Sequence, residues 1–354
     1  MSKVIVSIVA WNSMKYLPEA LASVSRQTHP DISVVVVDNA SSDGSAEFVR
    51  REYPKATVIR NAKNLGFARA HNQAIAHAAA HLKSDGDAFM LVMNPDVIME
   101  PDYLKELVAH VERRPEVGSA TGKIFRMRRT GEDVLAEGEK TDVFDTTGMV
   151  VYRSRRTTER GGGERDDVSP EALAKGDGGI YAKTEEVFGV SGALALYRMS
   201  ALEDVAYGDE FFDDDFFAYK EDVDLAWRLR LAGWQALYVP HAVAYHYRTA
   251  AGGGESNLKT LRNRLRKPKI VNFLSYRNHF LLLVKNDQFF NALLALPWIF
   301  WYELRKAGIV LLLETRSLAA VPSAFRLLPR MLAKRRRTFS RARTKAREIR
   351  KWFV

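Results

Sequence analysis

The sequence predicts an α/β fold with a mostly parallel sheet and helices on both of its faces. Two observations carry the prediction: strand patterns that are apolar throughout, and helix patterns that separate them along the chain. Continuously apolar strands are typical of sheets covered on both faces, and strand–helix alternation is typical of parallel sheets. A third observation, polar residues placed directly after the strands, gives this fold a candidate ligand site.

The first 125 residues contain the expected strands, with helices between them. A helix with Leu17, Leu21 and Val24 on one side follows the first strand, and an Ala-rich helix that opens after Gly66 precedes the fourth. The strands are expected at 4–10, 33–39, 56–61 and 88–96. Ligands of such sheets lie beyond the carboxyl ends of the strands. The polar residues expected at that edge are Asn12, Asp38, Asn64 and Asp96.

The rest of the chain divides into two further regions. A second half is expected at 126–262, with a long loop excursion at 127–183 where the sequence is rich in glycine and charge. The same half contains a helix that starts at Glu221 and Asp222. After it, residues 263–354 are expected to form a helical extension that associates with a membrane.

Composition excludes several kinds of chemistry. Cysteine is absent, so the chain has neither a disulfide framework nor a thiolate metal site or nucleophile. An apolar fraction of 47% and a charged fraction of 27% fit a well-cored globular protein. The first apolar run is too short for a signal peptide and is followed at once by polar residues, so we expect a cytoplasmic protein.

The net charge of +10 is concentrated at the end of the chain. Residues 331–354 hold ten of the 53 lysines and arginines and one of the 43 acidic residues, so this tail carries +9 and the remainder +1. The apolar run 289–302 precedes it and is too short to span a bilayer. Together they predict peripheral attachment to the inner, anionic face of the cell membrane, with Trp298, Trp301 and Trp352 at the interface. The alternative is a solvated basic helix after a core-packing helix.

Two carboxylates at the predicted sheet edge are candidates for ligand binding. Asp96, after the rigid Asn94-Pro95 turn, is placed to hold Mg²⁺ or Mn²⁺ against phosphates. Its alternative role is to cap the next helix. Asp38 is placed to bind a ribose hydroxyl or a base N–H. Its alternative is an ordinary loop in which Ser42 or Asp43 caps the following helix.

Two later stretches complete the set of candidates. Glu221, Asp222 and Asp224 open a helix behind the aromatic stretch FFDDDFFAY, which predicts a partly desolvated general base. Acids in a first helical turn are also favoured by the helix dipole, so a structural role stays open. His246 follows a strand and could join Asp96 on the metal, although a histidine between two tyrosines is more often structural.

Taken together, these stretches resemble the inverting family 2 glycosyltransferases with the GT-A fold, a Rossmann-like α/β fold. The resemblance covers about residues 4 to 248. The matching pieces are VSIVAWNSMKYLPEALASVSRQT, VVVVDNASSDGS, NAKNLGFARAHNQAI, LVMNPDV, GVSGALALYR, FFAYKEDVDLAWRLRLAGW and HAVAYHYR. NLGFA with NPD, and RNHFLLLVKN further on, resemble the bacterial rhamnosyltransferase-type branch.

The resemblance implies a role for each candidate residue. Asp222 is the catalytic base of a Glu-Asp motif with Glu221, and Asp96, with His246, is the metal ligand. Asn94 replaces the first acid of the family's Asp-X-Asp. The residues implied in binding the nucleotide sugar are Ala10, Asn12, Asp38, Asn39, Asn64, Gly66, Asn72 and Asn94. Those implied on the acceptor side are Ser191, Gly192, Phe212 and Trp227.

The implied activity is transfer of one sugar, with rhamnose favoured, from a dTDP- or UDP-linked donor. The acceptor is a glycan or a lipid-linked intermediate of cell-envelope polysaccharide synthesis, and the cofactor is a divalent cation, Mg²⁺ or Mn²⁺. The Gln-X-X-Arg-Trp signature of processive synthases is missing, so we expect one transfer per binding event.

Three rival functions fit the sequence less well. A nucleotidyltransferase that makes sugar nucleotides would carry a Gly-rich triphosphate loop after the first strand, and a dinucleotide-dependent dehydrogenase would carry Gly-X-Gly-X-X-Gly there. The stretch AWNSMKYL has no glycine. A nucleic-acid binder would need a broad basic face, which the nearly neutral body lacks, so we expect no nucleic-acid partner.

Overall fold

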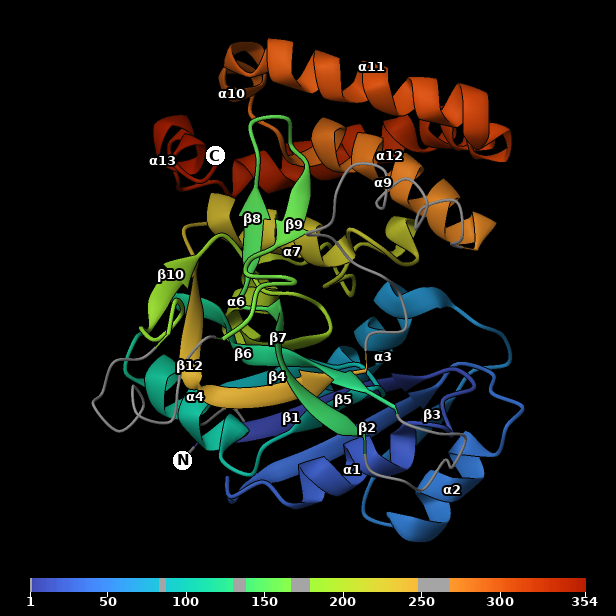
Figure 1. Ribbon diagram of the computed structural model, residues 1–354, viewed down its shortest axis with the longest axis vertical. Coiled ribbons are helices and arrows are strands. Elements are labelled where there is room, and N and C mark those ends of the chain that lie inside the picture. Colours follow the sequence, from blue (N-terminus) through green and yellow to red (C-terminus); the bar gives the residue numbers. More distant parts are fainter. Residues whose placement is uncertain (1, 83–86, 130–137, 167–178, 248–267) are drawn as a thin grey trace.

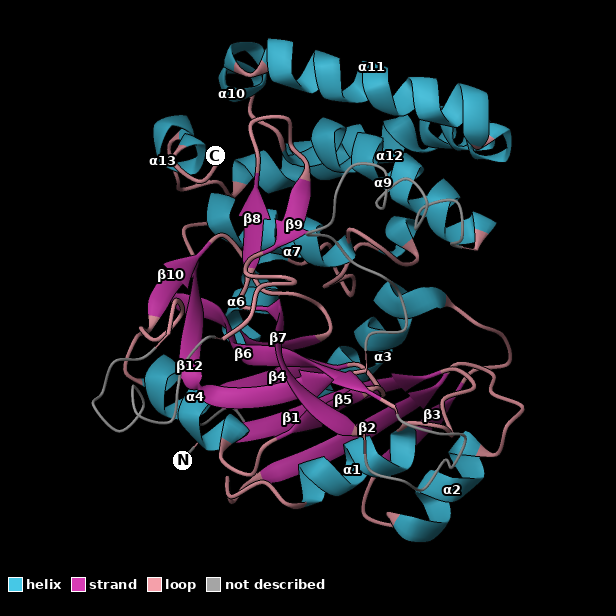
Figure 2. Ribbon diagram, in the orientation of Figure 1, coloured by secondary structure: helices cyan, strands magenta, loops and turns pink. Residues whose placement is uncertain are grey.

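A ten-stranded mixed sheet runs through the centre of the computed structural model (Figures 1 and 2). The structure describes residues 2–82, 87–129, 138–166, 179–247 and 268–354. The main path of the sheet has the strand order β10-β12-β6-β11-β4-β1-β2-β3, with β5 beside β12 and β7 beside β6. Strands β3, β2, β1 and β4 are parallel, whereas β11 runs antiparallel to β4. The α/β prediction with a mostly parallel N-terminal half is confirmed.

The strands begin and end close to the predicted positions in the N-terminal half. They are β1 Lys3–Ala10, β2 Ile32–Asp38, β3 Thr57–Arg60, β4 Ala88–Met93, β5 Val97–Met99, β6 Val117–Arg128, β7 Glu139–Thr146, β8 Met149–Val151, β9 Thr157–Glu159, β10 Glu185–Val187, β11 Leu194–Arg198 and β12 Gln235–His246. β1 lies between β2 and β4, and its register with β2 ends on the pair Ala10 and Asp38. This register brings the ends of β1 and β2 to one edge of the sheet.

Helices cover both faces of the sheet. The α-helices are α1 Leu17–Ser25, α2 Ser45–Glu52, α3 Gly66–His81, α4 Tyr103–Glu112, α6 Met199–Val205, α7 Glu221–Leu231, α9 Lys269–Asn286, α10 Phe289–Leu294, α11 Leu296–Leu313, α12 Ala320–Ser340 and α13 Ala346–Arg350, and the 3-10 helices are η1 Asp214–Phe216 and η2 Thr315–Ala319. Apolar residues of α1, α2 and α4 pack on one face of the sheet, and those of α3, α6 and α7 pack on the other. Both faces of the central strands are therefore buried, which explains their continuously apolar sequences.

The C-terminal helices form further layers above α7. α9 and α12 lie against each other and against α7, and α10 and α11 form the layer furthest from the sheet (Figure 1). The described part of the C-terminal region is helical, as predicted, and the apolar run 289–302 is divided between α10, which ends at Leu294, and α11, which starts at Leu296. Within the described residues no helix is long and apolar enough to cross a bilayer.

The predicted loop excursion at 127–183 is wrong for its central part. Residues 139–146 form β7, which pairs with β6 in the main sheet, and β8 and β9 form a hairpin that reaches toward α10 (Figure 1). β7 has the sequence EKTDVFDT, with only two apolar residues, so its apolar content is too low to reveal it as a strand. The parts of the excursion at 130–137 and 167–178 lie outside the described residues.

The basic tail is packed more closely than either sequence-based alternative expected. Met331 and Ile349 are buried, and Trp352 stacks under the guanidinium of Arg230 with 4.2 Å between that group and the ring centroid. Trp352 is therefore a partly buried packing residue, and its ring is less available to an interface than expected. Trp298 and Trp301 remain 48% and 60% exposed, respectively, as an interfacial role requires.

Candidate active site

The end of β2 places a buried carboxylate beside the end of β1. Asp38 is fully buried, and its Oδ1 accepts a hydrogen bond of 3.1 Å from the backbone N of Ser41. Asp38 Oδ2 has no hydrogen-bond donor among the described residues, although the Nε of Arg60 lies 3.4 Å away. A buried carboxylate oxygen without a hydrogen bond is costly, so a ligand N–H or O–H that reached it would be favoured.

The loops beside Asp38 hold each other through amide side chains. Asn39 Nδ2 donates to Asn64 Oδ1 at 2.9 Å and to the carbonyl of Gly66 at 3.1 Å. Asn64 Oδ1 also accepts from the backbone N of Gly66 at 2.8 Å. Ala10 is fully buried and its carbonyl accepts from the backbone N of Asn39, while the exposed Asn12 accepts from Ser42. Asn39 and Asn64 thus fix the loop that opens α3.

Gly66 lies against a strained loop that leads to the Glu-Asp pair. Its φ is +83°, and a Cβ at this position would lie 2.5 Å from the carbonyl oxygen of Phe217. Phe217, Tyr219 and Lys220 themselves have positive φ values of 64°, 70° and 74°. Non-glycine residues in this conformation are costly and concentrate at functional sites. The loop 217–220 is therefore held by its surroundings immediately before Glu221 and Asp222.

Asp222 is fixed at the start of α7 by two backbone donors. Its Oδ1 accepts from the N of Val223 at 2.8 Å, and its Oδ2 accepts from the N of Gly192 at 3.1 Å. Both donors come from rigid backbone, so the direction of the carboxylate is set before any ligand arrives. Each oxygen still has a lone pair for a further hydrogen bond.

Glu221 is buried beside Asp222 in an apolar environment. Burial, followed by the charge of Asp222, raises the pKa of Glu221 well above its ordinary value. Burial and the same two carboxyl groups also raise the pKa of Tyr197. Glu221 Oε2 and the hydroxyl of Tyr197 are buried without a hydrogen-bond partner among the described residues. Burial thus favours the neutral form of Glu221.

Asp96 and His246 meet where β12 pairs with β5. The Nε2 of His246 lies 3.3 Å from Asp96 Oδ1, and its Nδ1 lies 2.8 Å from Asp145 Oδ2. Burial lowers the pKa of His246, but the hydrogen bonds to Asp145 and Asp96 outweigh burial and raise that pKa to about 9. Asp96 and His246 are thus in contact, and their shared role as metal ligands stays a prediction. No cluster of three or more candidate metal ligands occurs among the described residues, so these two are at most a partial ligand set.

A short backbone connection links Asp222 to the Asn94-Pro95-Asp96 turn. The N of Gly192 binds Asp222, and the carbonyl of the next residue, Ala193, accepts from the N of Asn94 at 2.8 Å. The neighbouring pair Leu194 and Met93 then continues as the antiparallel register of β11 and β4. The two acids expected to carry the chemistry therefore lie at the same edge of the sheet.

Several predicted contact residues have structural roles instead. Phe212 and Trp227 are fully buried in apolar clusters, which corrects their expected place on the acceptor side. Asn72 binds the backbone N and O of Phe212 at 2.8 and 2.7 Å, so its amide ties α3 to the loop before η1. Ser191 remains beside the site, where its hydroxyl donates to Glu159 at 3.2 Å.

Two residues of α9 that hold the loop 217–220 were not predicted from the sequence. The amide Nδ2 of Asn278 on α9 donates to the carbonyls of Phe216, Ala218 and Tyr219 at 2.8, 2.9 and 2.7 Å. Its neighbour Arg277 donates to the carbonyl of Asp215 at 2.7 Å. The polar residues of α9 are scattered among apolar ones, so the sequence offered no signal that singled out Asn278. Its buried amide needs several partners, and the loop carbonyls supply them.

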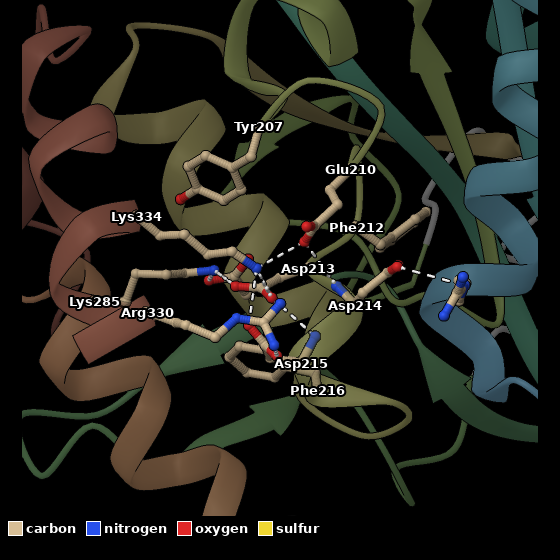
Figure 3. A network of polar contacts seen from close by, with 12 residues as sticks. Tyr207, Glu210, Phe212, Asp213, Asp214, Asp215, Phe216, Lys285, Arg330 and Lys334 are labelled. Atoms are coloured by element: carbon tan, nitrogen blue, oxygen red, sulfur yellow. Dashed lines mark hydrogen bonds and ion pairs between the residues drawn. The ribbon is translucent and has the colours of Figure 1, made fainter. Parts of the chain in front are cut away.

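A buried charge network connects residues 210–215, which precede this loop, and α7 to the C-terminal helices (Figure 3). Lys285 on α9 is fully buried between Asp213 and Asp224, and its Nζ lies 2.7 Å from Asp224 Oδ1. Lys334 on α12 binds Asp213 at 2.5 Å and also contacts Glu210 and Asp215. Burial raises the pKa of Asp213, but Lys285 and Lys334 outweigh burial and hold that pKa well below its usual range. The acidic stretch DDD is thus a docking point for the C-terminal helices.

Comparison with known sequences places the chain in one family. Residues 5–206 match the family described as Glycosyl transferase family 2, and residues 177–333 match Glycosyl transferase family group 2. An N-acetylglucosaminyl-diphospho-decaprenol L-rhamnosyltransferase of Mycobacterium tuberculosis is 30% identical over 69% of this chain and 76% of its own length. A poly-beta-1,6-N-acetyl-D-glucosamine synthase of Staphylococcus epidermidis is 22% identical over 67% of this chain, which spans about half of that synthase.

Solved structures show the same fold. S. aureus TarS 1-349 superposes with a TM-score of 0.52 at 17% identity, covering 99% of this chain and 90% of that chain. GalNAc-T7 with UDP, GalNAc and Mn²⁺ superposes with a TM-score of 0.54 at 14% identity, covering 80% of this chain and 48% of that one. The fold is therefore of the GT-A type, with a mixed, mostly parallel sheet. From the family match and the 30% identical relative, the chain belongs to glycosyl transferase family 2 and is a glycosyltransferase.

Proposed function

We propose that this glycosyltransferase transfers one sugar with inversion, rhamnose being the favoured sugar, from a nucleoside diphosphate donor to a lipid-linked glycan. The observation that carries the proposal is the connection of Asp222 through Gly192 and Ala193 to the Asn94-Pro95-Asp96 turn. It puts a fixed carboxylate for the acceptor and a second carboxylate for the donor diphosphate at one sheet edge. The reaction needs one group to take the acceptor proton and another to hold the cation that balances the departing diphosphate, and the two carboxylates match these needs.

Asp222 is proposed as the general base. The acceptor oxygen bonds to the anomeric carbon as the bond from that carbon to the diphosphate oxygen breaks, and the acceptor proton passes to Asp222. A positioned base is worth about 10²–10⁴-fold in rate. The two backbone N–H groups of Val223 and Gly192 support this assignment, because they fix the direction of the Asp222 carboxylate.

Donor binding is assigned to the edge formed by β1 and β2. Asp38 Oδ2, buried without a hydrogen bond among the described residues, is a suitable acceptor for a base N–H. Trp11 directly follows β1 and is 57% exposed, so its ring is available to stack on the nucleotide base. The proposed donor is dTDP-rhamnose, with a UDP-linked sugar as the alternative, because the 30% identical relative is an L-rhamnosyltransferase.

The residues at the β12–β5 pair fit a divalent cation. Asp96 supplies a carboxylate and His246, in its neutral form, an imidazole nitrogen, while Asp145 orients the imidazole, as carboxylates commonly do for metal-bound histidine. A bound cation would take the place of the proton that the two carboxylates favour on His246. Asp96 and His246 would hold Mn²⁺ or Mg²⁺, which supplies positive charge for the departing diphosphate. GalNAc-T7 was crystallised with Mn²⁺, which supports the choice of cation.

The acceptor is proposed to be lipid-linked and the protein to attach peripherally to the inner face of the cell membrane. The acceptor named for the mycobacterial relative is N-acetylglucosaminyl-diphospho-decaprenol. The outer surface of α10 and α11 carries aromatic and aliphatic side chains that are exposed, as an interfacial helix requires.

A donor panel tests the proposal. Full-length protein is given dTDP-rhamnose, UDP-glucose or UDP-N-acetylglucosamine with N-acetylglucosaminyl-diphospho-prenol in detergent, with Mn²⁺ or with a chelator. We expect the acceptor to gain the mass of one rhamnose, with release of dTDP that the chelator abolishes. Sugar transfer from UDP donors alone would overturn the rhamnose assignment, and product that forms equally well with chelator would overturn the metal site.

A further inference from the structure

The layer furthest from the sheet exposes an extended apolar surface, here called the outer apolar face. It consists of large side chains of α10 and α11 that are each 48–70% exposed: Phe289, Phe290, Leu293, Leu294, Leu296, Trp298, Phe300, Trp301 and Leu304. These helices make the top layer in Figure 1. Contiguous exposed surfaces of this kind mark interaction sites rather than ordinary protein surface.

A cavity of about 560 Å³ opens beside the outer apolar face. Leu294 and Trp298 of that face line one side of it. Its other walls come from the β8–β9 tip and from the end of the chain, and they carry the cations Arg153, Arg347, Arg350 and Lys351. No aspartate or glutamate is among its lining residues. The cavity is thus positively charged and half apolar.

The lining cations are not neutralised by the protein. Among the described residues, Arg153, Arg347, Arg350 and Lys351 form no ion pair with a carboxylate. A fifth cation of the lining shows the contrast: Arg155 is fully buried, and its Nε lies 2.8 Å from Asp287 Oδ2. Unpaired cations gathered in one cavity repel each other, so an anion that entered would be bound.

Hydrogen bonds hold the walls of the cavity in place. Arg155 donates to the carbonyls of Arg153 at 2.8 Å and Asn291 at 2.9 Å, which joins the β8–β9 tip to α10. Asn291 Nδ2 donates in turn to the carbonyl of Ala346 at the start of α13 at 2.8 Å. These buried contacts fix the three elements that carry the cations and the apolar residues relative to one another.

We propose that this cavity binds the phosphate group of an anionic membrane phospholipid while the outer apolar face lies among its acyl chains. The two surfaces match the two parts of one lipid: Arg153, Arg347, Arg350 and Lys351 face the charged headgroup, and Trp298 faces the interface. The proposal deepens the peripheral attachment proposed above and adds the site and the lipid class that it recognises.

The test compares two triple variants of the full-length protein. Arg347→Gln, Arg350→Gln and Lys351→Gln together remove three cations from the cavity. The control variant removes the same charge from exposed positions remote from this face, by Lys55→Gln, Arg113→Gln and Arg114→Gln. Sedimentation with vesicles of phosphatidylcholine alone, or with 30% phosphatidylglycerol (about one anionic lipid in three), measures binding of each.

Cations near an anionic leaflet each contribute roughly a five-fold factor in partitioning. The cavity variant is therefore expected to bind the anionic vesicles about 100-fold more weakly than wild type, while the control variant binds as wild type does. Residual binding to neutral vesicles should be equal in all three proteins. If both variants lost vesicle binding equally, the loss would follow from net charge alone, and the proposed lipid site would be wrong.

Two further measurements separate the possible sources of the anion and the two proposals. Inorganic phosphate at millimolar concentration should not displace wild type from anionic vesicles; complete displacement would assign the cavity to a free phosphate compound. Sugar transfer to acceptor dissolved in detergent should be unchanged in the cavity variant. Loss of vesicle binding with intact transfer supports the lipid site, whereas a wild type that transfers no sugar overturns only the proposed function.

Discussion

The carboxylate of Asp222 is held by the backbone N of Gly192 at 3.1 Å, across 30 residues of sequence. Gly192 belongs to the turn that leads into β11, and Asp222 opens α7, so the bond joins the sheet to the helix that carries the proposed base. The turn is also bonded to Asn94 through Ala193. The turn at Gly192 and Ala193 therefore positions Asp222 and also binds Asn94, a residue expected on the donor side.

Gly66 tests whether the close approach of the loop 217–220 matters for activity. Gly66→Ala adds a Cβ that meets the Phe217 carbonyl at 2.5 Å, so the loop must shift and turnover should fall about 10²-fold. Gly44→Ala is the matched control, because Gly44 has nearly the same φ of +84° but no atom within 4 Å of its added Cβ. The Gly44→Ala variant should lose about 1–2 kcal/mol of unfolding free energy and little activity. Steady-state kinetics and thermal unfolding of both variants measure these effects. Equal turnover in Gly66→Ala and Gly44→Ala would show that the contact between Gly66 and Phe217 has no role in activity.

Asn278 is expected to act as a positioning residue for Asp222. Asn278→Asp replaces an amide that donates to three loop carbonyls with a group that can only accept, so the loop 217–220 loses its support. We expect kcat to fall on the order of 10²-fold with the donor KM nearly unchanged. Ser275→Ala on the same helix is the control and should behave as wild type. A rise in the donor KM with normal kcat would place Asn278 on the donor side instead.

Asp145 was not predicted from the sequence and gives a direct test of the metal site. Asp145→Asn weakens the hydrogen bond that orients His246, and such changes behind a ligand typically lower metal affinity 10–100-fold. The Mn²⁺ concentration for half-maximal activity should rise by that factor. Asp142→Asn, on the same strand but exposed, should leave it unchanged. An unaltered Mn²⁺ requirement in Asp145→Asn would remove His246 from the ligand set.

The network around Lys285 should stabilise the whole protein. Lys285→Met removes one of the cations that face Asp213 and Asp224, which keep Lys334 and Arg228 as partners. Breaking a buried pair completely costs about 3–5 kcal/mol of unfolding free energy, so the loss should approach but not exceed that value. The exposed Lys269 begins the same helix, and Lys269→Met should change stability by less than about 0.5 kcal/mol. Urea unfolding measures both. A Lys285 variant as stable as wild type would show that the C-terminal helices are not docked through these charges.

The strands, the sheet edge and the Glu-Asp helix could be predicted from the sequence because they depend on local patterns. Continuously apolar runs gave β1, β2 and β4, and the acids at 221, 222 and 224 marked the start of α7. The residues Asp38 and Asp96 were placed correctly because parallel strands end at a common edge.

The remaining features depend on contacts between distant residues, which no local pattern reports. Asp145 lies in a polar strand whose register with β6 is irregular, so neither its strand nor its partner His246 was visible. The tail was interpreted by its charge alone, whereas Lys334 binds acids more than 100 residues away. Phe212 and Trp227 matched a motif near the acceptor, but packing had placed their rings in the core.

Asp222 is the proposed acceptor of the proton from the acceptor hydroxyl, and the variant Asp222→Asn removes this base. Its side chain keeps the size of the original but cannot act as a base, and Asp209→Asn, at an exposed position thirteen residues earlier, is the control. Transfer to the lipid acceptor and calorimetric binding of dTDP-rhamnose with Mn²⁺ are measured on the same preparations. We predict that Asp222→Asn lowers kcat by at least about 10³-fold with the donor Kd unchanged; turnover within about tenfold of wild type would contradict the claim.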